Sequence, residues 1–148
     1  MEFTELISDF ASRHGVEGLA AEDGAAALDV DGVAILLAAA GDALVASAEI
    51  GEPPPDGAAT FADLLLEANL ESEDFFAKSK ENGKYLLVRR VPLAGLGGDA
   101  FDSALEALVN RAEAWRKLLA DYRPAAAAAA EAAAADATAV GTGGFMQV

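Results

Sequence analysis

Cysteine is absent from this 148-residue chain, and histidine occurs only once, as His14. The lack of cysteine excludes disulfide frameworks, thiolate zinc sites and cysteine nucleophiles. A single histidine can supply only one member of an imidazole metal site or of a Ser-His-Asp triad. Basic residues are also scarce, since ten Lys and Arg stand against 25 Asp and Glu and give a formal net charge of −15. Nucleic acids and anionic membranes favour the opposite sign, so we expect an acidic domain that binds neither.

Long hydrophobic runs are missing as well. The longest apolar stretch, residues 33–41, is far shorter than the roughly 20 residues that a membrane-spanning helix needs. The first five residues carry no basic segment of the kind that opens a secretory signal. The absence of cysteine fits a reducing compartment, and we therefore expect a cytoplasmic protein.

Motifs of the common enzyme classes are not found either. No serine lies in a Gly-x-Ser-x-Gly turn, and neither a Gly-Lys-Ser/Thr phosphate loop nor an Asp-x-Asp-x-Asp-Gly calcium loop occurs. With 25 acidic residues, clusters such as Glu71, Glu73 and Asp74 are expected by chance. His14 stands in the last turn of a predicted helix, where the helix dipole favours a cation. We expect no enzyme, no metal site and no cofactor.

Apolar periodicity predicts three helices. In the first, apolar residues at positions 3, 6, 7 and 10 form one stripe, and Gly15 follows as a stop signal. The last helix has a stripe that steps by four and three residues, and Pro124 ends it. The middle helix, with Thr60 as its expected N-cap, carries more apolar residues than one stripe can hold, so a second surface should cover the excess. The expected ranges are 3–14, 61–70 and 99–122.

Turn signals divide the remaining sequence into five short strands. Asp31-Gly32 and Gly41-Asp42 join three of them into a meander, and Asn82-Gly83 joins the other two. The second strand is apolar on both faces, so we expect helices or a partner to cover both. The basic residues of the second hairpin are interpreted as a solvated sheet edge that resists aggregation. The strands are expected at 25–30, 33–40, 43–50, 75–80 and 84–91, and the basic residues are Lys78, Lys80, Lys84, Arg89 and Arg90.

These elements give an α+β fold in the order α-βββ-α-ββ-α, with helices packed on a twisted antiparallel sheet. Residues 1–123 form the expected domain. Residues 124–148 are rich in alanine but lack an apolar stripe with which to dock, so we expect a flexible tail, with a short solvated helix as the alternative.

Three segments in this order resemble one protein family. They are Leu64-Leu-Leu-Glu-Ala-Asn-Leu70, Val88-Arg-Arg-Val-Pro-Leu93, and the helix from Phe101 to Ala112-Glu-Ala-Trp115. The pattern is similar to that of the class I type III secretion chaperones, the CesT/SycE group, over about residues 3–120. The resemblance implies a bacterial cytoplasmic homodimer that, without ATP, holds the N-terminal segment of a secreted effector soluble and ready for export.

The resemblance also implies two sets of site residues. An isologous dimer interface would use the middle helix and the strand after it, although these residues could instead pack within the monomer core. Effector capture would use a sheet edge and apolar grooves, and some of that set must be ordinary core. A regulatory or structural dimer of the same fold, like the YbjN-type domains, is the alternative function. The interface residues are Leu65, Leu66, Asn69, Leu70, Phe75 and Phe76, and the effector-binding residues are Leu6, Phe10, Leu28, Val30, Ile35, Leu37, Leu44 and Val45.

Overall fold

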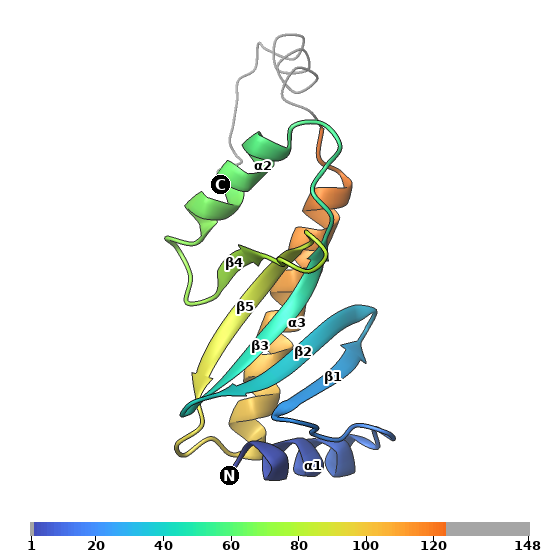
Figure 1. The fold of residues 1–148 in the computed structure, drawn as a ribbon, viewed down its shortest axis with the longest axis vertical. Helices are drawn as coiled ribbons and strands as arrows, with labels where there is room; N and C mark the ends of the chain where they lie inside the picture. Colours follow the sequence, from blue (N-terminus) through green and yellow to red (C-terminus); the bar gives the residue numbers. More distant parts are fainter. Residues whose placement is uncertain (1, 124–148) are drawn as a thin grey trace.

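A computed structural model describes residues 2–123 of the chain, and the tail expected at 124–148 lies outside the described residues. The elements follow one another as expected: a helix, three strands, a helix, two strands and a long helix (Figure 1). Their bounds are α1 (Phe3–His14), β1 (Ala25–Val30), β2 (Val33–Ala40), β3 (Ala43–Gly51), α2 (Ala58–Ala68), β4 (Phe75–Lys78), β5 (Tyr85–Pro92) and α3 (Gly98–Ala120).

The five strands form one antiparallel sheet in the order β1-β2-β3-β5-β4, so that β1 and β4 are its two edges. The β1–β2 turn places both Asp31 and Gly32 at positive φ, 52° and 84°. Two such residues make the type I′ turn that matches the twist of a two-residue hairpin. The predicted α+β fold class is confirmed.

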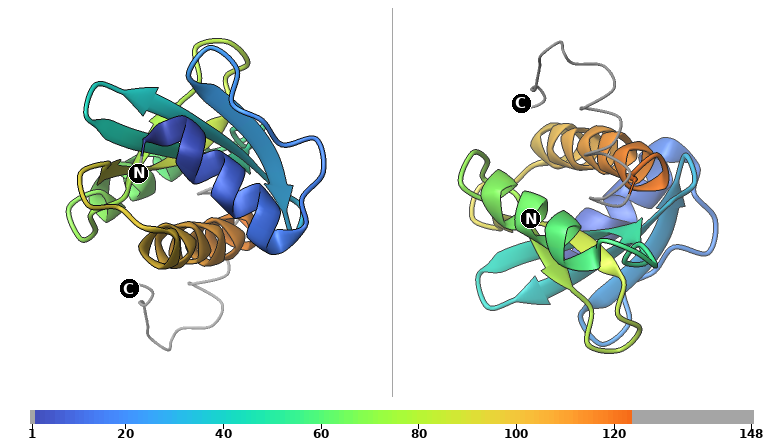
Figure 2. Two further views of the ribbon diagram at one scale, coloured as in Figure 1. Left: turned by 90° about the horizontal axis from the view of Figure 1, so that it is seen from below. Right: turned by 90° about the horizontal axis from the view of Figure 1, so that it is seen from above.

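One face of the sheet carries the hydrophobic core. Along β3, Leu44, Ala46, Ala48 and Ile50 are buried, whereas the three residues between them are only half-buried, as expected when side chains alternate between faces. The apolar stripe of α1 and the stripe of α3 belong to the same core cluster. Figure 2 shows α3 beside the sheet, and Figure 1 shows α1 near the start of α3 with α2 at its far end.

Helix ends differ from the sequence prediction in two places. Thr60 is not the cap of α2, because the helix begins at Ala58 after Gly57, which adopts φ 80°. Likewise α3 begins at Gly98 with Gly97 as its N-cap, and Asp99 lies in the first turn. In α1, by contrast, Gly15 ends the helix at φ 63° as predicted. The positive φ explains why glycine stands at position 57, whereas Gly97 has the extended backbone that any residue adopts.

The second hairpin is shorter than predicted. β4 ends at Lys78, and the amide of Ser79 donates to the carbonyl of Lys84 across a wider turn. The Ser79 hydroxyl accepts from the amides of Glu81 and Asn82, and the Asn82 side chain accepts from the amide of Lys84. Side-chain hydrogen bonds of this kind compete with the strand ladder and stop it early.

Candidate functional site

An apolar surface without a partner spans α2 and the start of β4. Four of the six large apolar side chains that are exposed within residues 2–123 lie here, and we call them the α2–β4 patch. Leu70 is 89% exposed and Leu66 is 64% exposed, values that leave most of each side chain in water. Large apolar side chains that are exposed on two elements in contact make this region a candidate interaction surface. The patch consists of Leu64, Leu66, Leu70 and Phe75.

The residues expected at a dimer interface divide into three groups. Leu66, Leu70 and Phe75 lie on the α2–β4 patch. Leu65 and Phe76 are buried in the core of the single chain, because Phe76 follows Phe75 on the strand and therefore points to the helix-covered face. The Phe76 ring meets Trp115 edge-on, with the ring centroids 4.8 Å apart.

Asn69, the sixth member of that set, shapes the turn between α2 and β4. Its Oδ1 accepts a hydrogen bond of 2.6 Å from the amide of Phe76, and its Nδ2 donates to the carbonyl of Phe76 at 3.4 Å. The Asn69 side chain thus makes the two hydrogen bonds to the Phe76 backbone that a neighbouring strand would otherwise make. Asn69 fixes where Leu70 and Phe75 emerge.

A buried ion pair holds the same turn to the body of the domain. Asp74 is 1% exposed, and Arg89 of β5 binds both of its oxygens, at 2.5 and 3.1 Å. Arg89 also donates to the carbonyl of Ala104 in α3 at 3.4 Å. Bidentate pairing of a carboxylate with arginine is strong and directional. It ties the turn between α2 and β4 to β5 and α3.

This ion pair corrects two sequence interpretations. Asp74 is not part of a chance cluster of acids, and Arg89 does not lie on a solvated edge, because β5 runs between β3 and β4 inside the sheet. Lys84 is also engaged, at 3.2 Å from Glu49 of β3. Asp74 and Arg89 lie close in space but 15 residues apart in the sequence. That spacing matches neither helix nor strand periodicity, so no sequence pattern identified the pair.

The expected effector-binding residues lie mostly in the core. Leu6, Phe10, Ile35, Leu37 and Leu44 are buried in the single chain, because α1 docks on the sheet face toward which these strand residues point. They hold the helices and sheet together, and Phe10 also lines a cavity at the end of α1.

The other three members of that set are partly exposed. Leu28 and Val30 lie on the edge strand β1 and pack at the margin of the core, whereas Val45 lies on the opposite face of β3. Leu36, which sequence reasoning did not single out, is 50% exposed on that opposite face. β2 was expected to be covered on both faces, yet within residues 2–123 helices cover only one.

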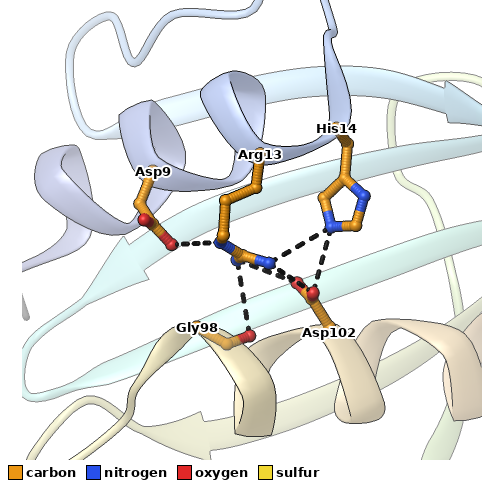
Figure 3. A network of polar contacts seen from close by, with 5 residues as sticks. All are labelled: Asp9, Arg13, His14, Gly98 and Asp102. Atoms are coloured by element: carbon orange, nitrogen blue, oxygen red, sulfur yellow. Dashed lines mark hydrogen bonds and ion pairs between the residues drawn. The ribbon is translucent and has the colours of Figure 1, made fainter.

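At the other end of the molecule, Arg13 links α1 to α3. Its guanidinium binds Asp9 at 2.7 Å and both oxygens of Asp102 at 2.5 and 3.1 Å, and it reaches the carbonyl of Gly98 at 3.5 Å (Figure 3). The His14 ring lies 3.0 Å from Asp102, so the only histidine has a carboxylate partner beyond the helix dipole. The hydrogen bond from Arg13 is the main reason that the pKa of Asp102 is lowered.

Removing this link should change the acid stability of the domain. The pKa of Asp102 is lower in the folded chain, so its interaction with Arg13 stabilises the fold above a pH of about 4, the ordinary carboxyl value, and is lost as the pH falls through the lowered pKa. We expect Arg13→Gln to lower the urea midpoint at pH 7, and we expect this difference to shrink as the pH falls through the lowered pKa of Asp102.

Urea unfolding followed by circular dichroism across this pH range measures the difference. Asp9 and His14 of α1 also contact the Arg13 guanidinium. The complete urea unfolding curves of the variant and the unaltered chain are therefore compared at each pH. Arg90→Gln, at an exposed position of β5, is the matched control and should show no such pH-dependent difference. A difference that does not shrink at all as the pH falls below about 4, the ordinary carboxyl value, would contradict the role of Arg13.

Two structural absences apply to the described chain. No helix within residues 2–123 has the length and apolarity that crossing a membrane requires. The same residues place no three His, Asp or Glu side chains together in a way that would hold a metal ion.

Comparison with known proteins gives one family. The model of the Tir chaperone protein (CesT) family matches residues 5–116. No curated protein sequence matches the chain significantly.

Solved structures give consistent neighbours. The chain is similar to one in the crystal structure of the ExsC-ExsE complex, with 25% identity and a TM-score of 0.71 over 80% of this chain and 97% of that one. It is also similar to a chain in the ExoT-SpcS complex from Pseudomonas aeruginosa, with 26% identity and a TM-score of 0.56 over 73% and 91%. The fold alone is shared with the Yersinia pestis type III secretion chaperone SycH in complex with a fragment of YscM2, at 24% identity and a TM-score of 0.61 over 77% and 99%.

Proposed function

Because the chain belongs to the Tir chaperone protein (CesT) family, we propose that it is a type III secretion chaperone that works as a homodimer. In this proposal the dimer binds the N-terminal segment of one secreted effector in the bacterial cytoplasm, without ATP, and keeps it soluble and competent for export. The observation that carries the proposal is the α2–β4 patch, an apolar surface left open in a member of a chaperone family.

The α2–β4 patch supports dimerisation. A two-fold axis near Leu70 would bring the same residues of both protomers together, the arrangement that an isologous interface requires. Asn69 and the Asp74–Arg89 pair hold the turn rigidly, so little ordering would be needed on association. Leu65 and Phe76 support the patch from beneath and do not contact the partner.

A second surface is left for the effector. β1 is an edge strand with one side unpaired within the described sheet, so an extended segment can add to it by backbone hydrogen bonding. Leu28 and Val30 on that strand, and Leu36 and Val45 on the open face, offer apolar contacts. The net charge of −15 would speed encounter with a basic segment.

Capture of this kind needs no nucleotide. Backbone pairing and apolar burial supply the binding energy, and release would follow when another component competes for the segment. The role is therefore stoichiometric binding and not catalysis.

Affinity purification of the tagged chain from its native cytoplasm tests the proposal. Mass spectrometry identifies what is retained, and light scattering measures the mass of the eluted complex. We expect one abundant effector, held through a short N-terminal segment, on two copies of the 15.0 kDa chain. A dimer with no effector when secretion is active would instead favour a regulatory dimer, and a monomer would contradict the proposed interface.

A further inference from the structure

Arg111 of α3 has a buried polar atom without a hydrogen-bond partner. The atom is its Nε, and within residues 2–123 no other buried side-chain nitrogen or oxygen lacks a partner. No acidic residue in that range forms a salt bridge with Arg111 either. Buried polar groups in native proteins almost always have partners, so one without a partner needs an explanation. Arg111 is a cation that the described part of the chain leaves unpaired.

An aromatic ring holds the Arg111 guanidinium in place. Its Cζ lies 5.7 Å from the centroid of the Phe76 ring, a distance at which a cation is attracted to an aromatic face. The Phe76 ring is itself fixed by Trp115 of the same helix. Arg111 as a whole is only half-buried, so part of its side chain can still be reached from solvent. A cation fixed in this way loses little freedom when an anion binds to it.

Arg111 lies beside the α2–β4 patch. The Asn69 side chain binds the backbone of Phe76, so Leu70, the next residue, lies close to the ring that Arg111 covers. β4, which carries Phe76, is the edge strand of the sheet next to α2 (Figure 1). On α3, Leu118 follows Arg111 by seven residues, about two turns of the same helix face, and it is also exposed. A protomer that covers Leu70 therefore also approaches Arg111.

The acidic residues on either side of Leu70 are unpaired as well. Glu67, Glu71 and Glu73 are exposed, and none of them forms a salt bridge within residues 2–123. Two chains that each carry a net charge of −15 repel one another. A two-fold interface near Leu70 would take some of these carboxylates out of water, which opposes association unless a cation pairs with them.

We propose that Arg111 forms an ion pair with the carboxylates of Glu71 and Glu73 of a second copy of the chain, an inference that rests on the proposed homodimer. A two-fold axis makes two such pairs, and each is incomplete until the other copy contributes its acids. The guanidinium can donate to a carboxylate along one edge while its face stays on Phe76. The pairs add a charged contact to the apolar patch and favour one orientation of the two protomers.

A charge exchange between two chains tests the pairing. One chain carries Arg111→Glu, and the other carries Glu71→Arg together with Glu73→Arg. Each variant alone places like charges opposite one another, so its dimer dissociation constant should rise about a hundredfold, which is tenfold for each of the two pairs. A mixture of the two chains should form a heterodimer, because one of its pairs is native and the other is the same pair reversed. Native mass spectrometry, with a purification tag on one chain only, measures the proportions.

Two further variants serve as controls. Arg111→Met keeps a side chain over Phe76 but removes the charge, and it should raise the dissociation constant at least about tenfold. Lys117→Glu makes a charge reversal at an exposed position farther along α3, beside Ile50 of β3, and should leave the constant nearly unchanged. Circular dichroism checks that each chain is folded, and Arg111→Met decides the question if Arg111→Glu does not fold. Unchanged dimerisation of Arg111→Met, or exchanged chains without preference for each other, would overturn the proposal.

The failure of this proposal is distinguishable from the failure of the proposed function. If the unaltered chain is a dimer that retains an effector while the exchanged chains show no preference, only the Arg111 pair is wrong. If the exchanged chains form the heterodimer but the unaltered dimer retains no effector, the chaperone role is wrong and the pair stands. An unaltered chain that is monomeric would refute both the homodimer and the pair.

Discussion

Replacing Leu70 with aspartate is expected to convert the proposed dimer to a folded monomer. Leu70 is almost fully exposed in the single chain, so the change removes nothing from the monomer core. Burying a leucine contributes about 2 kcal/mol. Both protomers of a two-fold dimer carry the substitution, so this loss of binding free energy occurs twice. A total of about 4 kcal/mol corresponds to a dissociation constant raised roughly a thousandfold. Sedimentation equilibrium measures the constant, and circular dichroism checks the fold.

A matched control separates the interface from general surface chemistry. Leu36→Asp alters an apolar side chain that is half exposed on the open face of β2, away from α2, and should leave the dimer intact. Phe76→Asp would be uninformative, because it places a charge in the core and unfolds the chain. A Leu70→Asp chain that remains dimeric at micromolar concentration would refute the placement of the interface.

Arg89→Met is expected to destabilise the fold by about 3 kcal/mol, because it leaves the buried carboxylate of Asp74 without its cation. Loss of one partner from a buried ion pair usually costs roughly 3–5 kcal/mol, and the partial exposure of Arg89 favours the lower part of that range. Urea unfolding at a fixed protomer concentration measures the change, since stability depends on concentration if the chain dimerises.

The double variant Asp74→Leu/Arg89→Met tests the explanation. With both charges removed no buried group is left unpaired, so its free energy of unfolding should lie closer to that of the unaltered chain than the single variant's does. A double variant that is less stable than the unaltered chain by the sum of the Asp74→Leu and Arg89→Met effects would mean that the two residues act independently.

Local chemistry was enough to predict the order of the elements. Asp31-Gly32 strongly favours a tight hairpin turn, because glycine adopts positive φ freely and aspartate tolerates it better than most residues. The apolar spacing of α1 needs no knowledge of its neighbours, and Gly15 ends the helix as its backbone freedom allows. The three segments that resemble the family are likewise local patterns, and the family match agrees with them.

Which of the predicted site residues are exposed could not be derived from the sequence, because burial depends on contacts distant in sequence. Phe75 and Phe76 are adjacent and chemically alike, and only the docking of α3 on one sheet face sends Phe76 into the core and leaves Phe75 outside. The same docking buries Leu37 and exposes Leu36 on one strand. Periodicity identifies the two faces of a strand, but it does not say which one a helix covers.

The sequence by itself determined an acidic α+β domain without thiol chemistry, the order of its helices and strands, and its family. Only the tertiary structure decided which apolar residues are surface, that Asp74 and Arg89 form a buried pair, and that Arg13 links α1 to Asp102 of α3. The physical reason is that turns and helices follow from interactions within a few residues. A surface or a cavity exists only after segments far apart in the chain have packed together.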